Sequence, residues 1–309
     1  MSEASHWERT VGRPVASAQV GRSFSTRVRD WNRLPPALIP LLLVAPLLIY
    51  MLVFYALPVL AMLLRSVNEP TWTLANYTAL LDDPVFLKTF SITLNTALVV
   101  TVATLLLGYP VALGLVRARS LAPLILIVVL LPFWTSVLVR SYAWMVLLGR
   151  HGLINEALLA AGLIERPIRI LNTTLATQIA MTHILLPYMI LPIANALRQI
   201  DPSLLRAASG LGATPWNTFR QVILPLSMPG VVAGVLLVFV LSLGFYITPA
   251  MVGGPRDITL SMLIAQSVDQ LNWSYAATLG TVLLATALAL VAAAQRLPGV
   301  GDAFRTNIR

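Results

Sequence analysis

Residues Asp201 to Pro229 read DPSLLRAASGLGATPWNTFRQVILPLSMP, a polar segment punctuated by Gly and Pro between two long apolar runs. Asp201-Pro202 places a helix N-cap before a proline at the first helical position, and Thr214-Pro215 repeats this start. Gly210 and Gly212 separate the two starts. The segment therefore predicts two short helices joined by a glycine turn, a protrusion small enough to enter a groove on a partner.

The composition of the rest of the chain predicts an all-α polytopic membrane protein. Hydrophobic residues make up 58% and charged residues 11% of the chain, and the mean hydropathy is +0.82, whereas soluble domains carry about 25% charged residues. The absence of cysteine excludes disulfides and Cys-based metal sites. The net charge of +9 comes mainly from arginines that flank apolar runs, which indicates membrane topology and no nucleic-acid partner.

Six apolar runs are each long enough to cross a hydrocarbon core of ~30 Å as a helix. They are Pro35–Leu64, Ile92–Val116, Leu121–Leu148, Leu171–Leu197, Val231–Met251 and Leu271–Gln295. The polar segment lies between the fourth and fifth runs, and Pro225 and Pro229 are expected to end its second helix. This pattern predicts an N-terminal tail (1–34), a first transmembrane helix with its outer loop (35–91), a main transmembrane domain (92–296) and a C-terminal tail (297–309).

Basic residues predict the orientation of the six spans. With both termini in the cytoplasm, that side holds fourteen arginines: Arg9, Arg13, Arg22, Arg27, Arg29, Arg33, Arg117, Arg119, Arg198, Arg206, Arg220, Arg296, Arg305 and Arg309. The other side holds seven basic residues: Arg65, Lys88, Arg140, Arg150, Arg166, Arg169 and Arg256. Because cytoplasmic loops are enriched in Lys and Arg, both termini and the polar segment are expected in the cytoplasm.

The polar segment resembles the EAA loop of ABC importer permeases, E-A-A-x-x-x-G followed by L-P. Here it reads Arg206-Ala207-Ala208-Ser209-Gly210-Leu211-Gly212 and closes at Leu224-Pro225, so Arg206 replaces the leading Glu. In that family the loop forms a coupling helix that sits in a cleft of a cytoplasmic ATPase. The resemblance implies an ATPase-coupling role for Arg206, Ala207, Ala208, Gly210, Gly212, Ala213, Trp216 and Phe219. An amphipathic connector on the membrane surface is the alternative.

Four further motifs resemble the spermidine/putrescine permease subfamily of type I ABC importers. They are Pro132–Ser136 (PFWTS), Val139–Trp144 (VRSYAW), Gly152–Asn155 (GLIN) and Thr248–Pro255 (TPAMVGGP). The resemblance implies a bacterial inner-membrane permease that works with an ATPase dimer, a second and different permease, and a solute-binding protein. An importer of an opine-like or other small organic solute, or an ion-coupled secondary transporter, is the alternative.

Polar and aromatic residues within or beside the runs are candidates for the translocation pathway. Each candidate also has a purely structural explanation. Aromatic residues at helical spacing can form a packing face, a histidine in the membrane can form a hydrogen bond to another helix, and carboxylates in loops can simply be solvated. The candidates are Trp134, Tyr142, Gln178, His183, Met189, Asp257 and Asp269. The two aspartates flank the last outer loop, where they are suited to attract a cation.

Two local patterns carry separate expectations. A third helix starting at Leu121 climbs ~28 Å before Arg140, which predicts that Arg140 snorkels to the headgroups or the outer vestibule beside Trp144. A direct contact between Arg140 and the substrate is the alternative. Gly230 and Gly234 have the G-x-x-x-G spacing of a close helix contact.

The sequence lacks the residues that several kinds of catalysis and metal binding require. Lys88 is the only lysine and follows no glycine-rich loop, so the chain has no P-loop and is not itself expected to hydrolyse ATP. No cluster has metal-ligand spacing, and no serine stands in a nucleophile elbow. The chain is therefore expected to be a transport subunit without catalytic residues, metal or cofactor.

Overall fold

A computed structural model describes residues 38–68, 72–118 and 120–296, with side chains from residue 43 onward. Within these residues all regular secondary structure is helical, which confirms the all-α class. The predicted tails (1–34 and 297–309) and Arg119 lie outside the described residues. The chain divides into two compact units, residues 1–61 and 62–309.

One long helical stretch, which begins in the first unit and ends in the second, forms the first span. It consists of α2 (Leu38–Met51) and the π-helical η2 (Leu52–Ala56), and it continues without a break into α3 (Leu57–Asn68). The stretch Leu43–Asn68 is long and apolar enough to cross a membrane, so the first apolar run forms a helix as predicted.

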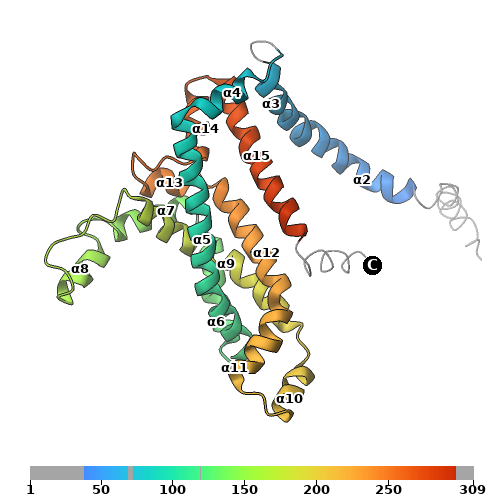
Figure 1. Ribbon diagram of the computed structural model, residues 1–309, viewed down its shortest axis with the longest axis vertical. Helices are drawn as coiled ribbons and strands as arrows, with labels where there is room; N and C mark the ends of the chain where they lie inside the picture. Colours follow the sequence, from blue (N-terminus) through green and yellow to red (C-terminus); the bar gives the residue numbers. More distant parts are fainter. Residues whose placement is uncertain (1–37, 69–71, 119, 297–309) are drawn as a thin grey trace, which may run out of the picture. The chain divides into compact units, whose positions relative to one another are not determined.

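In the second unit four further helices have the length and composition of membrane spans (Figure 1). They are α5 (Pro84–Arg117), α9 (Thr174–Arg198), the continuous helix Pro215–Leu243 and α15 (Trp273–Gln295). Shorter helices connect them: α4 (Ala75–Asp82), α8 (Leu153–Ala160), α10 (Pro202–Gly210), α13 (Ile247–Val252) and α14 (Leu260–Asp269). With the bent third run counted as one span, the described residues contain six spans.

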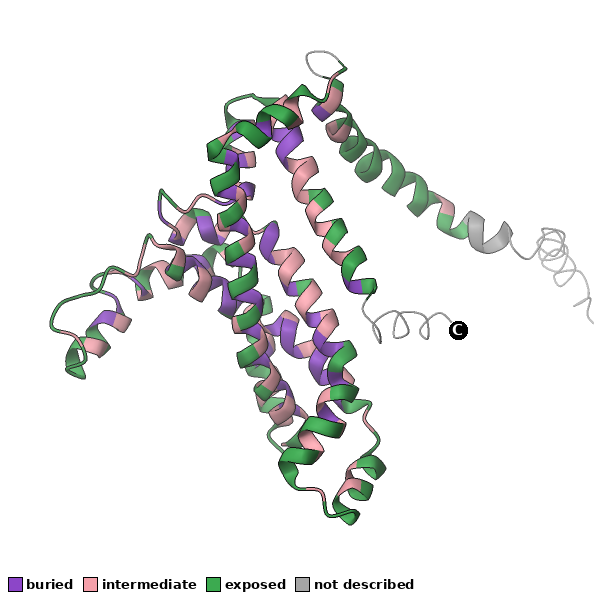
Figure 2. Cartoon of the chain, viewed as in Figure 1, coloured by how far each residue is buried: buried purple, intermediate pink, exposed green. Residues whose placement is uncertain are grey.

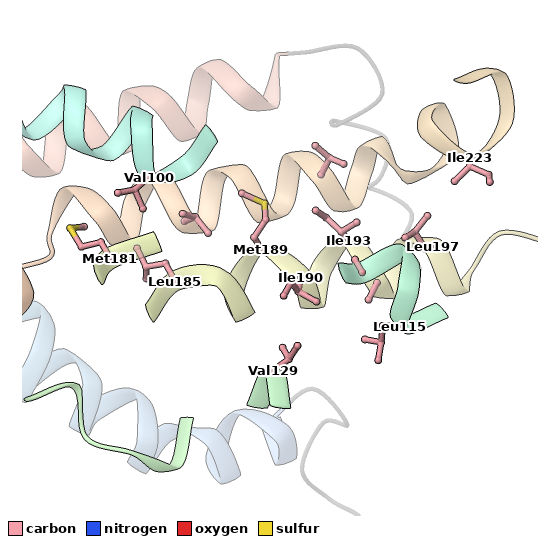
Figure 3. Close-up of a cluster of buried hydrophobic side chains, with 14 residues drawn as sticks. Val100, Leu115, Val129, Met181, Leu185, Met189, Ile190, Ile193, Leu197 and Ile223 are labelled. Carbon is pink, nitrogen blue, oxygen red and sulfur yellow. The ribbon is translucent and has the colours of Figure 1, made fainter. Parts of the chain in front are cut away.

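The core of the second unit lies between α5, α9 and the helix that ends at Leu243. Its fully buried members include a row of side chains along α9, and Figure 3 labels four of them: Met181, Leu185, Met189 and Ile193. Since apolar side chains on several faces of α9 are buried, this helix is surrounded by protein, whereas much of α15 is exposed (Figure 2).

The helices α4 and α14 lie near the ends of α5 and α15, at the end of the unit that is away from α10 (Figure 1). Asp83 starts α5 by accepting a hydrogen bond of 2.8 Å from the backbone N–H of Val85, with Pro84 at the first helical position. Its second carboxylate oxygen accepts a hydrogen bond of 2.8 Å from the Tyr275 hydroxyl. One carboxylate therefore joins the ends of two spans.

The third apolar run is not one helix, and the prediction of a continuous helix over Leu121–Leu148 was wrong. It forms α6 (Ala122–Leu130) and the 3₁₀ helix η3 (Leu131–Trp134), then α7 (Val137–Leu147), and the two halves are bent by 102°. Pro132 lacks an N–H donor, and Thr135 and Ser136 are extended. Ser136 then caps α7 by accepting a hydrogen bond from Leu138 N. The bend removes the straight climb on which the expected depth of Arg140 was based.

The fifth span also differs from the expectation, because Pro225 and Pro229 do not stop the helix. It begins as α11 (Pro215–Thr218), passes through a π-helical turn, η4 (Phe219–Ile223), and continues as α12 (Leu224–Leu243). In the wide turn the N–H of Leu224 bonds to the carbonyl of Phe219, and Pro225 occupies the first turn of α12, where a missing donor is tolerated. The predicted run beyond Gly244 is the separate helix α13.

The predicted close contact at Gly230 and Gly234 is confirmed between α12 and α9. A Cβ at Gly230 would lie 2.5 Å from the Cβ of Ala196 and 2.6 Å from the carbonyl of Pro192. A Cβ at Gly234 would lie 2.8 Å from Sδ of Met189. These glycines let the two helix backbones approach directly.

Candidate functional site

Two regions of the second unit have the features of a functional site. The first is the α10 turn, which comprises α10, the connection 211–214 and α11. Asp201 caps α10 by accepting a hydrogen bond of 2.8 Å from Ser203 N. This backbone hydrogen bond lowers the pKa of Asp201 below its ordinary value, so the carboxylate cap is charged at neutral pH.

The glycine turn predicted at Gly212 is present. Gly212 has φ +77°, its N–H bonds to Ser209 O at 3.0 Å, and the N–H of Ala213 bonds to Ala208 O at 3.0 Å. These two bonds are those of a Schellman motif, which ends a helix with a residue in the left-handed conformation. Glycine adopts that conformation without a steric cost.

The predicted coupling residues divide into an outward and an inward set. Arg206, Ala207, Gly210, Gly212 and Trp216 are exposed, whereas Ala208, Ala213 and Phe219 are half-buried. Leu205, one helical turn before Ala208, packs against the core. The outward face of α10 therefore has small side chains, one exposed leucine (Leu204) and one cation, Arg206.

Aromatic contacts hold the start of the fifth span to α5. The ring of Phe219 meets that of Tyr109 edge-on with centroids 5.9 Å apart, and Trp216 stacks on Phe219 at 5.6 Å. The Tyr109 hydroxyl shares a hydrogen bond of 2.8 Å with the hydroxyl of Ser227. Phe219 thus anchors the α10 turn, while Trp216 is 66% exposed at its surface.

Sequence reasoning missed Leu211, which is 89% exposed between the two glycines. Leu211 and Trp216 are the large apolar side chains exposed on the connection and α11. The position of Leu211 between Gly210 and Gly212 was the available signal.

The second region lies where α7 meets α9. The indole Nε1 of Trp144 donates a hydrogen bond of 3.2 Å to Nδ1 of His183, and the two rings meet edge-on with centroids 5.5 Å apart. The hydroxyls of Ser141 and Thr248, both fully buried, share a hydrogen bond of 2.7 Å that joins α7 to α13. The half-helix after the bend is therefore fixed to its neighbours by side-chain polar bonds.

A cavity of about 410 Å³ lies beside this junction. Of the described residues that line it, Arg140 is the only charged one, and Tyr188, Phe245 and Tyr246 supply aromatic rings. Arg140 is half-buried, and its Nε is buried without a hydrogen-bond partner in the described chain. The sequence pattern placed Arg140 at the membrane interface and did not predict this cavity.

The structure does not gather the other predicted pathway residues into one site. Trp134 and Tyr142 are 78% and 57% exposed on opposite sides of the bend. Gln178 is half-buried on α9, and Met189 is fully buried against Gly108 and Gly234, where it packs between three spans.

The two aspartates have different surroundings. Asp257 is half-buried, and its Oδ1 accepts a hydrogen bond of 2.5 Å from the Thr174 hydroxyl at the start of α9. Asp269 is exposed at the end of α14. No group of three or more His, Asp or Glu residues in the described ranges is placed to hold a metal ion.

In the part of the chain that the structure describes, five helices, or six with the bent pair as one span, are long and apolar enough to cross a membrane. With the cavity beside α7 and the exposed α10 turn, they are the features of a multi-pass membrane permease. Residues 34–297 match the family described as "Binding-protein-dependent transport system inner membrane component". The chain belongs to this family. It is an inner-membrane ABC importer permease, the permease component of a binding-protein-dependent transporter and not itself an ATPase.

Relatives and a solved structure agree with this family. The spermidine/putrescine transport system permease protein PotB of Escherichia coli is 38% identical over 220 residues, which cover 71% of this chain and 80% of PotB. The inner membrane ABC transporter permease protein YdcU of Escherichia coli is 36% identical over 252 residues, covering 76% and 79%. A chain of a bacterial alginate ABC transporter, solved in complex with an alginate pentasaccharide-bound periplasmic protein, superposes with a TM-score of 0.68 at 19% identity, covering 89% of this chain and 97% of that chain.

The similarity to PotB confirms the resemblance to the spermidine/putrescine permeases. Family membership decides against the ion-coupled secondary transporter that the sequence left open. The alginate transporter shares the fold alone, at 19% identity, so it carries no argument about what this chain transports.

Proposed function

We propose that this chain forms half of the translocation pathway of an ATP-driven importer for a polyamine such as spermidine or putrescine. The observation that carries the proposal is the 38% identity to PotB of Escherichia coli over 80% of that protein. The four motifs from PFWTS to TPAMVGGP agree with it. The second candidate is an opine-like or other small organic solute.

The proposed partners follow from the same family. A cytoplasmic ABC ATPase dimer binds the α10 turn, a second and different permease completes the pathway, and a periplasmic or surface solute-binding protein delivers the solute. Exposure of Arg206, Ala207, Leu211 and Trp216 supports docking at the α10 turn, because a rigid protrusion with small and apolar side chains suits a protein groove. In this proposal nucleotide-driven closure of the ATPase moves α10 and, through Phe219, the fifth span.

The proposed orientation places both termini and the α10 turn in the cytoplasm. Support comes from an even number of crossings, six when the bent third run counts as one span, which is consistent with two ends on the same side. The distribution of arginines selects the cytoplasmic side. Domain boundaries at 34/35, 91/92 and 296/297 are proposed on the same basis.

Reconstituted uptake tests the proposed substrate. The complete transporter, co-expressed with its ATPase, second permease and binding protein, is placed in proteoliposomes with ATP inside or outside. ATP-dependent accumulation of labelled spermidine, competed by unlabelled putrescine and absent with a hydrolysis-deficient ATPase, is the expected result. Accumulation of an opine-like solute without spermidine transport would replace the polyamine with the second candidate.

A further inference from the structure

Arg140 is a charged side chain inside a broken membrane span, in contact with a cavity. The residue is half-buried, its Nε is buried without a hydrogen-bond partner in the described chain, and no described residue lining the cavity is acidic. A buried polar group without a partner is costly, and a charge without a counter-ion more so. An anion in the cavity would supply the missing partner.

The cavity has the size and lining of a ligand site. Its volume of about 410 Å³ falls within the ~300–1,000 Å³ of small-molecule pockets, and apolar or aromatic side chains make up most of its wall. Guanidinium binds carboxylate and phosphate oxygens more specifically than an ammonium does. We propose that the cavity beside the bend binds an oxyanion, a carboxylate or phosphate carried on an apolar body, through Arg140.

This site goes beyond the proposed import of a polyamine and does not depend on it. An ammonium group would be repelled by Arg140 in a setting where charges are poorly screened, so a polyamine does not rest in this cavity. Two sources can supply the oxyanion: a soluble carboxylate or the phosphate headgroup of a membrane lipid. The test distinguishes them.

Binding of octanoate to the complete transporter tests the site. The transporter is purified in dodecyl maltoside, whose headgroup is a sugar, and labelled octanoate is compared with octylamine, which carries the opposite charge. We expect Arg140→Gln to weaken octanoate binding about tenfold or more, on the scale of a charge-assisted hydrogen bond, and Arg140→Lys to weaken it less. Octylamine binding is expected to be unchanged or stronger in Arg140→Gln.

A second variant tests the cavity without touching the charge. Gly244 lines the cavity, its φ is −92°, and a Cβ there would meet no atom within 4 Å. Gly244→Leu therefore extends into open space and should block octanoate while the complex assembles normally. Arg150→Gln, at an exposed arginine near the start of α8, is the matched control and should bind octanoate as the wild type does.

The lipid content of the purified complex identifies the source. A phospholipid retained by the wild type and lost in Arg140→Gln, together with competition by dioctanoyl phosphatidylglycerol, assigns the site to a lipid phosphate. Direct octanoate binding with no retained phospholipid assigns it to a soluble carboxylate. Equal octanoate binding by wild type, Arg140→Gln and Gly244→Leu would overturn the proposal. The proposal would also be overturned if the wild-type complex did not bind octanoate and Arg140→Gln lost the second permease. Each of these results can occur whether or not the transporter imports spermidine.

Discussion

Trp144 and His183 are joined by a hydrogen bond of 3.2 Å from the indole Nε1 to the imidazole Nδ1, across the junction of α7 and α9. The histidine must therefore present an unprotonated Nδ1 to the indole. Because Trp144 lies after the 102° bend, this bond helps to fix the direction of α7, the second half of the third span.

The first prediction tests this bond. His183→Phe keeps a ring but loses the acceptor, and should lower the stability of the solubilised permease by about 0.6 kcal/mol, with an upper value near 1.7 kcal/mol. His183→Asn retains an acceptor and should lose less. Thermal unfolding of the two variants and of Trp144→Phe measures the effect. A Trp144→Phe/His183→Phe double variant whose loss equals the sum of the two single losses would show that the two residues do not interact.

The second prediction concerns Gly212, whose φ of +77° requires the left-handed conformation. Gly212→Val should cost about 1–2 kcal/mol and reduce the population of the correctly formed turn about 5–30-fold. We expect a correctly inserted permease with weak ATPase binding and little ATP-dependent uptake. Gly114→Ala is the matched control, because a Cβ there also meets nothing within 4 Å and the residue lies on α5, outside the predicted coupling residues. Normal coupling in Gly212→Val would remove the α10 turn from the coupling mechanism.

The third prediction concerns the outward and inward faces of α10. Ala207 is exposed and Ala208 half-buried, so Ala207→Trp should block ATPase docking without a change in thermal stability. Ala208→Trp should also disturb the packing of α10 against the rest of the permease and lower the unfolding temperature. Co-purification of the ATPase and thermal unfolding separate the two effects. A fully coupled Ala207→Trp transporter would contradict docking through this face.

The fourth prediction concerns Gly234 and its contact with Met189. A Cβ at Gly234 lies 2.8 Å from Met189 Sδ and 3.2 Å from Met189 O, so Gly234→Ala overpacks the core and should cost about 1–3 kcal/mol. In a Met189→Ala background, which lacks the sulfur, Gly234→Ala should cause a smaller loss of stability than it does in the wild type. Gly280→Ala, on the more exposed α15 with open space at its Cβ, should have little effect. The unfolding temperature in detergent is the measurement, and equal values for Gly234→Ala and Gly280→Ala would refute the contact.

The fifth prediction concerns the orientation of the spans. Reporter fusions at Asp82, Gly152 and Asp257 should be periplasmic, and a fusion at Gly210 should be cytoplasmic. The reason is that three spans, with the bent third run counted as one, separate Asp82 from Gly210, and one span separates Gly152 from Gly210. A periplasmic reporter at Gly210 would contradict docking of a cytoplasmic ATPase at the α10 turn.

Local signals predicted the parts of the fold that local chemistry controls. Asp201 and Thr214 cap the helices that they were expected to cap, and Gly212 takes the positive φ that the turn needs. The bend at Ser136 was not predicted, because a single serine cap gives little signal within a mainly apolar run. The continuation of the helix through Pro225 was not predicted either, because proline usually ends a helix and here a π-helical turn precedes it.

Sites that depend on packing between distant segments could not be predicted in the same way. The cavity at Arg140 is built from α7, α9 and the end of α12, and no spacing along the chain brings those three together. Met189 was a candidate for the pathway on its residue type, but its surroundings are Gly108 and Gly234. The ATPase-coupling and pathway roles of individual residues stay predictions.

The break between η3 and α7 also determines how a displacement can travel through the permease. A straight helix transmits a displacement from one end to the other. A helix that is broken by a 102° bend at extended residues can instead change its angle at the break. α6 packs on the core that α5 and α9 share, whereas α7 is tied to α13 through Ser141 and Thr248 and to α9 through Trp144 and His183. The two halves of the third span are therefore held by different sets of contacts, and α9 is the element that both of them touch.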